Sequence, residues 1–217
     1  MTTTRRSGAL LLAGAGALLS GPAWVQAPGY GTAAPPTVLE RVEERLEKNP
    51  ELRKIYDTRP NALDRLDWMV GSWGLVFKTY GTGRTPERTE SGTRETKWDL
   101  DRRWLVSRDE IPGKHAIEVL GYDAWRQMWV RQYVTSWGRG GMQALLGTRG
   151  WDGPVLPMQG TLYFFGEPAE IGFRLTKLSE DEYLETYEER LAGGSVVRPV
   201  LEIRFVRAKG GGPPAKK

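Results

Sequence analysis

The sequence predicts a mainly β protein: an antiparallel meander of roughly eight to ten strands closed into a barrel, with short helices at its N-terminus. Apolar residues recur at helical spacing before Gly71 and at every second position after it. The second part divides into short segments separated by turn signals such as Pro112-Gly113 and Gly193-Gly194. Because no helical segment there is long enough for a parallel crossover, neighbouring strands should pair as hairpins. A β-sandwich is the alternative architecture.

Residues 1–27 are interpreted as a secretory signal peptide. A basic pair at 5–6 precedes an apolar run over 9–19, and residues 25–27 form a small-x-small cleavage site. This run is shorter than the about 20 apolar residues that cross a membrane as a helix, so no transmembrane segment is expected in the mature form. The protein should therefore be exported, to the periplasm or the medium, and begin at Pro28. The arginine pair fits a twin-arginine signal as well as ordinary secretion.

The charge and the cysteine content narrow the function classes. The chain of 217 residues has 31 basic and 27 acidic residues. Removal of residues 1–27 leaves 29 basic against 27 acidic residues, a net charge of +2, with three of the lysines in the last nine positions. No basic stripe suits a nucleic acid, so that partner is not expected. The chain has no cysteine, so no disulfide would stabilise the exported protein.

The N-terminal segments are expected to be helical. Thr37 and Glu40 form a capping-box pattern at the start of a helix over 37–48, and Asn49-Pro50 ends it before a short second helix. Residues 61–70 show an apolar helical face, with Asn61 as a possible cap. The predicted organisation is a signal peptide at 1–27, a linker at 28–36, a helical extension at 37–60, a β-barrel domain at 61–208 and a disordered tail at 209–217.

Ten segments alternate between apolar and polar residues and are the expected strands. They are 73–80, 91–100, 103–111, 115–122, 127–137, 142–150, 159–165, 170–178, 182–190 and 197–207.

Gly71-Ser72-Trp73 stands where the first of these strands begins. A glycine permits the sharp inward bend that a barrel strand needs at its start, and a tryptophan two positions later is large enough to fill the narrow end. This Gly-x-Trp resembles the first strand of lipocalin-like proteins. The resemblance implies that Trp73 is a buried structural residue, with Arg204 of the last strand lying across its ring.

Residues 61–208 also resemble DUF1579, a bacterial family of unknown function whose members are similar to lipocalin-related barrels. The resemblance is carried by a Trp-x-Leu, an Arg-aromatic-Leu and a Gly-Tyr-Asp, here Trp98-Asp99-Leu100, Arg103-Trp104-Leu105 and Gly121-Tyr122-Asp123. It implies the fold, but no activity.

An aromatic face with one cation is the candidate ligand site. Alternation places Trp129, Arg131, Tyr133 and Trp137 on one face of a strand, opposite Ile117, Val119 and His115 unless the register differs by one. Trp98, Trp104 and Tyr187 are expected to reach the same interior. These rings either fill the barrel or line a cavity. In a cavity, a buried Arg131 without a protein partner such as Glu118 would select a ligand that has an anionic end.

Enzyme chemistry has weaker support in the sequence. No nucleotide-binding, zinc-protease or Gly-x-Ser-x-Gly motif is present, and no catalytic residue, cofactor or metal site is assigned. The acids of 180–189 are interpreted as a solvated edge, and His115 as a surface residue rather than a haem ligand.

The favoured hypothesis is an exported lipocalin-like barrel that binds a small apolar or amphipathic molecule. One alternative is an isomerase or cyclase that uses Glu118, Glu185 or Glu202 near Arg131, provided that the carboxylate is unpaired in the cavity with a raised pKa. Another is a structural domain whose contact surface is the helical segment 37–58. The oligomeric state is left open.

Overall fold

The computed structural model describes residues 35–81, 84–136, 142–164, 166–191 and 196–209. Within them the chain forms two α-helices, one 3-10 helix and ten β-strands. The fold is a closed antiparallel meander barrel, in which the strands pair in the order β1-β10-β9-β8-β7-β6-β5-β4-β3-β2. The predicted barrel is therefore confirmed.

The two α-helices, α1 (Val38–Lys48) and α2 (Pro50–Asp57), follow the sequence prediction closely. The Thr37 backbone N–H donates to Glu40 Oε2 at 2.6 Å, and the Glu40 N–H donates to Thr37 Oγ1 at 3.2 Å. This reciprocal pair is the predicted capping box. Asn49 caps α2, since its Oδ1 accepts a hydrogen bond from the Leu52 N–H at 3.2 Å.

The third helix, η1 (Asn61–Met69), is a 3-10 helix. Its apolar face is buried, as predicted, through Leu63, Leu66 and Met69. Asn61 is not the cap: the capping position belongs to Pro60, and no side chain forms a capping hydrogen bond there. Leu63 N–H instead donates to the carbonyl of Pro60 at 3.1 Å, so the backbone closes the first turn by itself.

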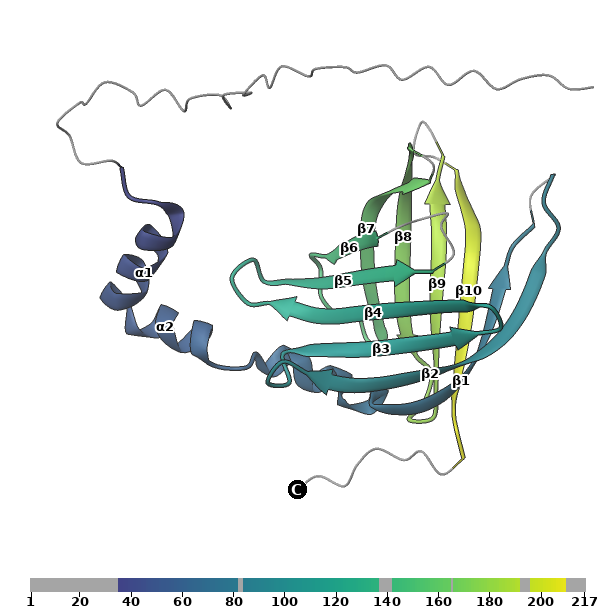
Figure 1. The fold of residues 1–217 in the computed structure, drawn as a ribbon, viewed down its shortest axis with the longest axis horizontal. Helices are drawn as coiled ribbons and strands as arrows, with labels where there is room; N and C mark the ends of the chain where they lie inside the picture. The colour runs from purple at the N-terminus through teal and green to yellow at the C-terminus, as the bar shows by residue number, and fades with distance from the viewer. Residues whose placement is uncertain (1–34, 82–83, 137–141, 165, 192–195, 210–217) are drawn as a thin grey trace, which may run out of the picture. The chain divides into compact units, whose positions relative to one another are not determined.

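The ten strands match the ten predicted segments, with differences at the ends. They are β1 (Gly71–Thr79), β2 (Arg88–Asp99), β3 (Trp104–Ile111), β4 (Lys114–Asp123), β5 (Met128–Thr135), β6 (Met142–Gly147), β7 (Val155–Phe164), β8 (Glu167–Lys177), β9 (Glu182–Arg190) and β10 (Val197–Arg207). Figure 1 shows β3, β4 and β5 running across β7, β8, β9 and β10, so that the wall folds over a central core.

The largest boundary error lies in β7, which begins four residues before the predicted segment 159–165. Pro157 lies inside this strand, opposite Arg174 of β8. A proline has no N–H to donate to a strand ladder. On its other side β7 faces β6, and among the described residues these two strands share a single pair, Leu146↔Gln159. The missing donor of Pro157 is tolerated at this weakly paired seam.

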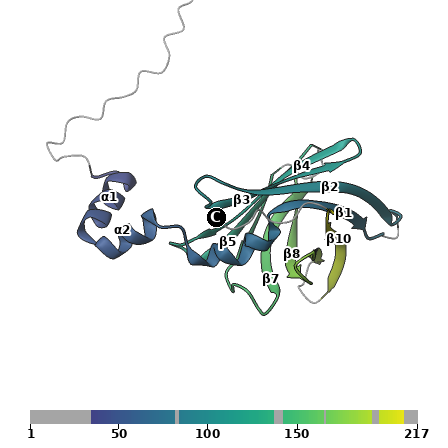
Figure 2. The ribbon, with the colours of Figure 1, turned by 90° about the horizontal axis from the view of Figure 1, so that it is seen from below.

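The first and last strands close the barrel. They pair from Trp73↔Arg207 to Thr79↔Leu201, and the Tyr80 N–H extends the ladder to the carbonyl of Val200 at 3.0 Å. Figure 2 shows the closure from below, with β1 beside β10. We call the end of the barrel where η1 leads into β1 the η1 end, and the opposite end the cavity end.

Trp73 fills the η1 end, as predicted. Gly71 has a φ of 127°, a conformation that favours glycine, and turns the chain into β1. Trp73 is 1% exposed, and its Nε1 donates to the carbonyl of Met69 at 2.8 Å. The expected arginine partner was wrong, because Arg207 and not Arg204 lies over the ring, at 4.1 Å from its centroid. Arg204 points outward and pairs with Glu182.

Candidate functional site

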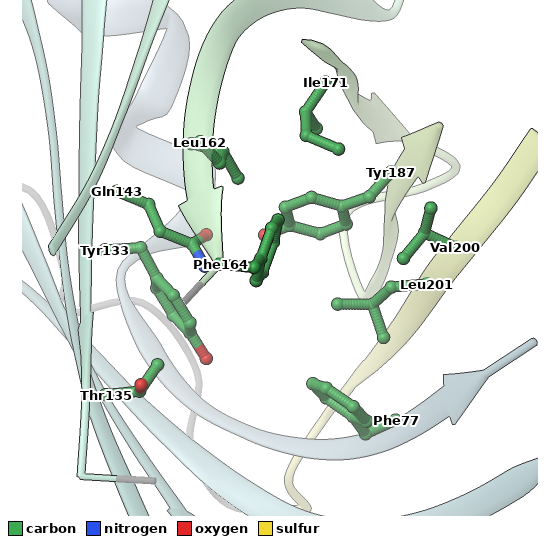
Figure 3. Close-up of a pocket in the computed structure, with 10 residues that line it drawn as sticks. All are labelled: Phe77, Tyr133, Thr135, Gln143, Leu162, Phe164, Ile171, Tyr187, Val200 and Leu201. Atoms are coloured by element: carbon green, nitrogen blue, oxygen red, sulfur yellow. The ribbon is translucent and has the colours of Figure 1, made fainter. Parts of the chain in front are cut away.

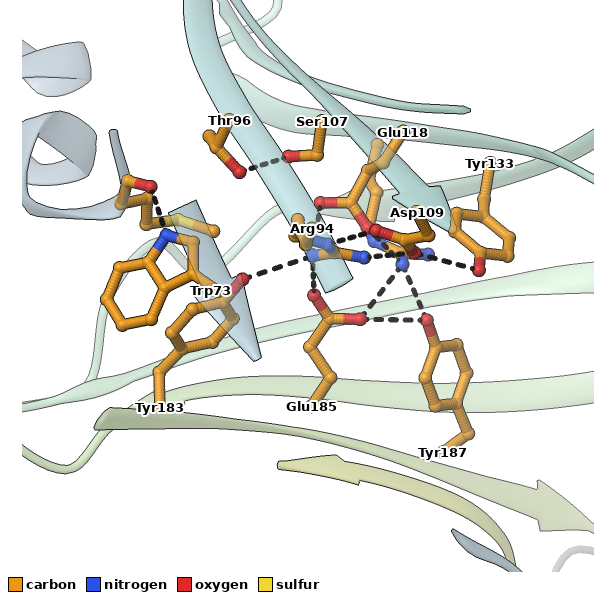
Figure 4. A network of polar contacts seen from close by, with 12 residues as sticks. Trp73, Arg94, Thr96, Ser107, Asp109, Glu118, Tyr133, Tyr183, Glu185 and Tyr187 are labelled. Atoms are coloured by element: carbon orange, nitrogen blue, oxygen red, sulfur yellow. Dashed lines mark hydrogen bonds and ion pairs between the residues drawn. The ribbon is translucent and has the colours of Figure 1, made fainter. Parts of the chain in front are cut away.

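Five ionisable side chains are buried together in the middle of the barrel: Arg94, Asp109, Glu118, Arg131 and Glu185. We call this group the charged layer. Its members come from β2, β3, β4, β5 and β9, so strands distant in the sequence contribute to one network. Figure 4 shows Arg94 near its centre, with Asp109, Glu118 and Glu185 around it and tyrosines on both sides.

Arg94 holds one side of the charged layer. Its Nε donates to Asp109 Oδ1 at 2.5 Å and its Nη2 to Asp109 Oδ2 at 2.8 Å, a two-pronged pair that matches the planar shapes of both groups. Its Nη1 donates to Glu185 Oε1 at 2.6 Å and to the Tyr183 hydroxyl at 3.3 Å, and lies 3.5 Å from Glu118 Oε1.

Arg131 holds the other side. Its Nη2 donates to Glu118 Oε2, to Glu185 Oε2 at 3.1 Å and to the Tyr187 hydroxyl at 2.5 Å. Glu118 and Glu185 therefore each bridge the two arginines, one oxygen to each. Two other nitrogens of Arg131, Nε and Nη1, have no hydrogen-bond partner among the described residues. The guanidinium lies over the ring of Phe173, at 4.4 Å from the centroid.

Three carboxylates face two guanidinium groups, and the pKa values reflect this imbalance. Burial raises the pKa of Glu118 and outweighs the attraction of Arg131 and Arg94, while the charges of Glu185 and Asp109 raise it further. Burial opposes the charge of Arg131, but the three acidic neighbours Glu118, Tyr187 and Glu185 raise its pKa. Both arginines therefore stay charged at neutral pH.

Alternation and register bring these residues together. Arg94 stands opposite Asp109 in the β2–β3 ladder, and Glu118 stands opposite Tyr133 in the β4–β5 ladder. The sequence analysis expected Ile117 and Val119 on the inner face of β4, which is wrong by one residue: Ile117 is 38% exposed and Glu118 2%. A one-residue shift exchanges the two faces of a strand, so Glu118 lies inside.

A cavity of about 140 Å³ lies at the cavity end of the barrel. Its wall is mostly apolar, and Figure 3 shows the side chains arranged around the space. The lining residues come from seven strands: Phe77, Tyr133, Thr135, Gln143, Leu162, Phe164, Ile171, Tyr187, Val200 and Leu201. This cavity is the candidate ligand site.

Two tyrosines connect the cavity with the charged layer. Tyr133 and Tyr187 line the cavity, while their hydroxyls donate to Asp109 Oδ2 at 3.2 Å and to Glu185 Oε2 at 3.1 Å. Burial raises the pKa of both tyrosines, so both stay protonated at neutral pH. The polar residues that line the cavity are Tyr133, Thr135, Gln143 and Tyr187, and the two tyrosines link it to the ionised groups of the charged layer.

The structure separates the predicted ligand residues. Tyr133 and Tyr187 line the cavity, and Arg131 lies behind them in the charged layer. Trp129 is buried inside the barrel, as alternation predicts, but at the η1 end, where it packs edge-on against Trp151 at 6.1 Å between ring centroids.

Two other predicted tryptophans, Trp98 and Trp104, do not line the cavity. Trp98 lies at the η1 end and donates its Nε1 hydrogen to Asp67 Oδ1 at 2.8 Å. Trp104 was expected inside but lies on the outer face, because its neighbour Leu105 takes the inward position. It covers Gly121, whose missing side chain leaves room for the indole ring. Trp137 falls outside the described residues.

The enzyme alternative required an unpaired carboxylate in the cavity, and none of its three candidate residues is placed in this way. Glu118 and Glu185 are buried and paired with arginines, and neither lines the cavity. Glu202 alternates with buried Ile203 and lies outside, where it accepts a hydrogen bond from the Tyr80 hydroxyl at 3.1 Å. The interpretation of the acids at 180–189 as a solvated edge is wrong for Glu185. His115 is exposed, as expected.

Sequence reasoning missed Arg94 and Asp109. Both occur in strands with many polar residues, a pattern that is typical of solvent-exposed positions. A signal was present: Arg94 and Thr96 share a face with Trp98, and Ser107 and Asp109 share a face with Leu105. Thr96 and Ser107 are buried too, and their hydroxyl oxygens lie 2.9 Å apart. Matching polar residues on the apolar face of neighbouring strands indicate a buried network.

Within the described ranges, no three His, Cys, Asp or Glu side chains are placed to hold a metal ion. The carboxylates of the charged layer face arginines instead. None of the helices in the described part of the chain has the length and apolar character of a membrane-spanning segment.

Comparisons with known proteins place the chain near other barrels only distantly. No protein-family model and no curated protein matches the sequence. An S-type phycobiliprotein lyase from Guillardia theta is similar over 69% of this chain and 94% of that chain, with 10% identity and a TM-score of 0.40. A redesigned β-barrel is similar over 70% and 99%, with 10% identity and a TM-score of 0.28. These similarities carry no argument about function, and membership of DUF1579 stays a prediction.

Proposed function

We propose that this protein binds a small, largely apolar molecule in the cavity between Tyr133, Leu162, Tyr187 and Leu201. The observation that supports this function is the cavity itself. Protein interiors are close-packed, and voids larger than a water molecule are few. A space of about 140 Å³ with a mostly apolar wall beside a fully buried ionic network is therefore costly to leave empty.

The size of the cavity limits the ligand. An apolar cavity of about 150 Å³ accommodates a single benzene ring, whereas drug-sized ligands occupy about 300 Å³ or more. The described cavity thus suits one ring or a short branched chain. A long fatty acid would have to displace wall residues such as Phe164.

Thermal unfolding with ring-sized probes tests the proposal. A ligand that binds only the folded protein stabilises it by RT ln(1 + c/Kd), where c is the free ligand concentration, so the melting temperature rises as c exceeds Kd. We expect benzene, toluene or a related ring to raise the melting temperature and to show saturable binding by ligand-observed NMR. If no probe of this size does so, the binding function is wrong.

A matched pair of substitutions assigns the binding to the cavity. Leu162→Trp places a large ring into the space, whereas Tyr163→Trp places the same ring on the outer face, where Tyr163 is 63% exposed. We expect Leu162→Trp to abolish the ligand-induced shift and Tyr163→Trp to retain it. Circular dichroism should confirm that both variants are folded. Equal loss in both would place the binding elsewhere.

We also propose that the protein works outside the cytoplasm. The support is the sequence of residues 1–27, which lie outside the described structure. Intact-mass analysis of exported protein should give a chain that begins at Pro28. An exported chain that retains residues 1–27 would contradict the signal peptide.

A further inference from the structure

We propose that the cavity prefers a neutral ring that carries a hydrogen-bond donor, such as a phenol, over a carboxylate of the same size. This inference rests on the proposed binding function and gives its ligand class. It reverses the sequence-based expectation that Arg131 selects an anionic end, because the structure supplies the partners that Arg131 was expected to lack.

The hydroxyl protons of Tyr133 and Tyr187 are already donated within the protein. A tyrosine hydroxyl has one proton to donate. Tyr133 gives its proton to Asp109 Oδ2, and Tyr187 gives its proton to Glu185 Oε2. Ionised acceptors hold these protons strongly. The phenolic oxygens therefore meet a ligand as acceptors, and an O–H or N–H group on the ligand complements them.

Tyr187 is the better placed acceptor. Its oxygen receives one hydrogen bond, from Arg131 Nη2 at 2.5 Å, and gives one, to Glu185. A hydroxyl oxygen has two lone pairs, so one position remains for a ligand donor. Donation from Arg131 and donation to Glu185 polarise the same oxygen, which strengthens a further hydrogen bond in a chain of this kind.

The charged layer behind the two tyrosines contains the carboxylates of Asp109, Glu118 and Glu185 against the guanidinium groups of Arg94 and Arg131. The carboxyl groups outnumber the guanidinium groups by one, and burial raises the pKa of Glu118. A ligand carboxylate would add a further negative charge next to this layer, in surroundings that screen charge poorly.

Arg131 does not offset this effect. It is not part of the cavity wall, and its guanidinium lies among the rings of Phe173, Tyr133 and Tyr187, at 4.4, 5.0 and 5.4 Å from their centroids. Its Nε and Nη1 are buried and have no hydrogen-bond partner among the described residues. The polar lining residue Gln143 has an amide that both donates and accepts, so it serves either ligand equally.

Titration calorimetry of the protein with toluene, phenol, anisole and benzoate near pH 7 tests the inference. A purely apolar cavity would favour toluene strongly, because water solvates phenol better. We expect phenol to bind at least as tightly as toluene, roughly 5- to 10-fold tighter than anisole, which accepts but does not donate, and at least about 10-fold tighter than benzoate.

The variant Tyr187→Phe removes the proposed acceptor and keeps the ring. Phenol should lose about 5- to 10-fold in affinity, and toluene should change less than about 2-fold. If this variant does not fold, the order of the four ligands on the unmodified protein still decides. Toluene binding with phenol excluded, or benzoate binding most tightly, overturns the ligand class and leaves the binding function intact. Binding of none of the four overturns both.

Discussion

The two ends of the barrel are built from similar residues but packed differently. At the η1 end, Trp73 meets the ring of Tyr183 edge-on at 4.8 Å, and Tyr183 stacks on Phe205 at 4.2 Å, with η1 across the opening. At the cavity end, Tyr133, Tyr187 and other large side chains leave about 140 Å³ between them. Large apolar residues alone therefore do not determine whether a barrel is filled.

The difference lies in what the polar atoms of these residues contact. At the η1 end, Trp73 and Arg207 donate to backbone carbonyls of residues 68–70, which fixes the rings against η1. At the cavity end, Tyr133 and Tyr187 donate to carboxylates of the charged layer. Their rings are held from the middle of the barrel and line a space. Packing at one end stabilises the fold, whereas the other end is suited to binding.

Truncating a large apolar side chain at each end should give the largest contrast. Trp73→Ala should lower the free energy of unfolding by about 3–5 kcal/mol, because it opens a cavity in a filled region. Leu201→Ala, at the half-buried rim of a space that already exists, should cost about 1–2 kcal/mol. Urea denaturation measures both. A loss below about 1 kcal/mol for Trp73→Ala would contradict its role as the filler of the η1 end.

The charged layer separates the two ends of the barrel. Removing one of its arginines tests how much the layer contributes to the free energy of unfolding. Arg94→Met leaves three buried carboxylates with one arginine and should cost about 3–5 kcal/mol in the free energy of unfolding. Arg174→Met is the matched control, since Arg174 is half-exposed and pairs with Glu188 at 2.7 Å on the surface. The control should change stability by less than about 1 kcal/mol. Equal effects would mean that water reaches the layer.

Arg204 and Arg207 of β10 are compared to test the description of the η1 end. Arg207 donates to the carbonyls of Trp68 at 2.7 Å and Val70 at 3.1 Å and lies over Trp73, so Arg207→Met should cost about 2–3 kcal/mol. Arg204→Met removes an exposed ion pair and should cost less than about 1 kcal/mol. Thermal or urea unfolding compares them directly. The reverse order would restore Arg204 as the partner of Trp73.

The pH dependence of stability should show the smallest effect. The folded protein raises the pKa of Glu118 above its ordinary value of 4.5 and so binds this proton more tightly than the unfolded chain does. Glu118 should therefore reduce stability progressively as pH rises above 4.5 and through its folded pKa. As the pH rises from about 4 to about 8, the unfolding free energy of Glu118→Gln should increase relative to that of the wild type. A constant difference would mean that Glu118 titrates normally.

The sequence predicted the barrel because strand alternation is a local property. Hydrophobic period and turn residues located all ten strands, and Gly71 and Trp73 located the start of the first. It was less reliable about which polar residue lies inside. Arg94 and Asp109 are polar residues at inward positions, and a single chain does not show which strand will neutralise them.

Two errors came from reading residue type before residue position. Ile203 and Phe205 alternate on the inner face of β10, which already assigns Arg207, and not Arg204, to the interior. In β4, the apolar residues Ile117 and Val119 were assigned inward although Ala116 and Leu120 have the opposite parity. The cavity itself could not be predicted, because it depends on how side chains from seven strands meet.

The weak β6–β7 seam has a consequence for the kinetics of folding. Apart from β6–β7 and β1–β10, every pair of neighbouring strands forms a ladder between segments that are close in the chain. The protein therefore divides into two locally paired meanders, β1–β6 and β7–β10. The two meanders are joined through the β1–β10 ladder, and beside it Tyr80 contacts Glu202, which is 122 positions away in the sequence. Contacts this distant in sequence form late. Substitutions at Leu75 or Phe205 should therefore speed unfolding in stopped-flow experiments, whereas substitutions in the β3–β4 hairpin should slow folding.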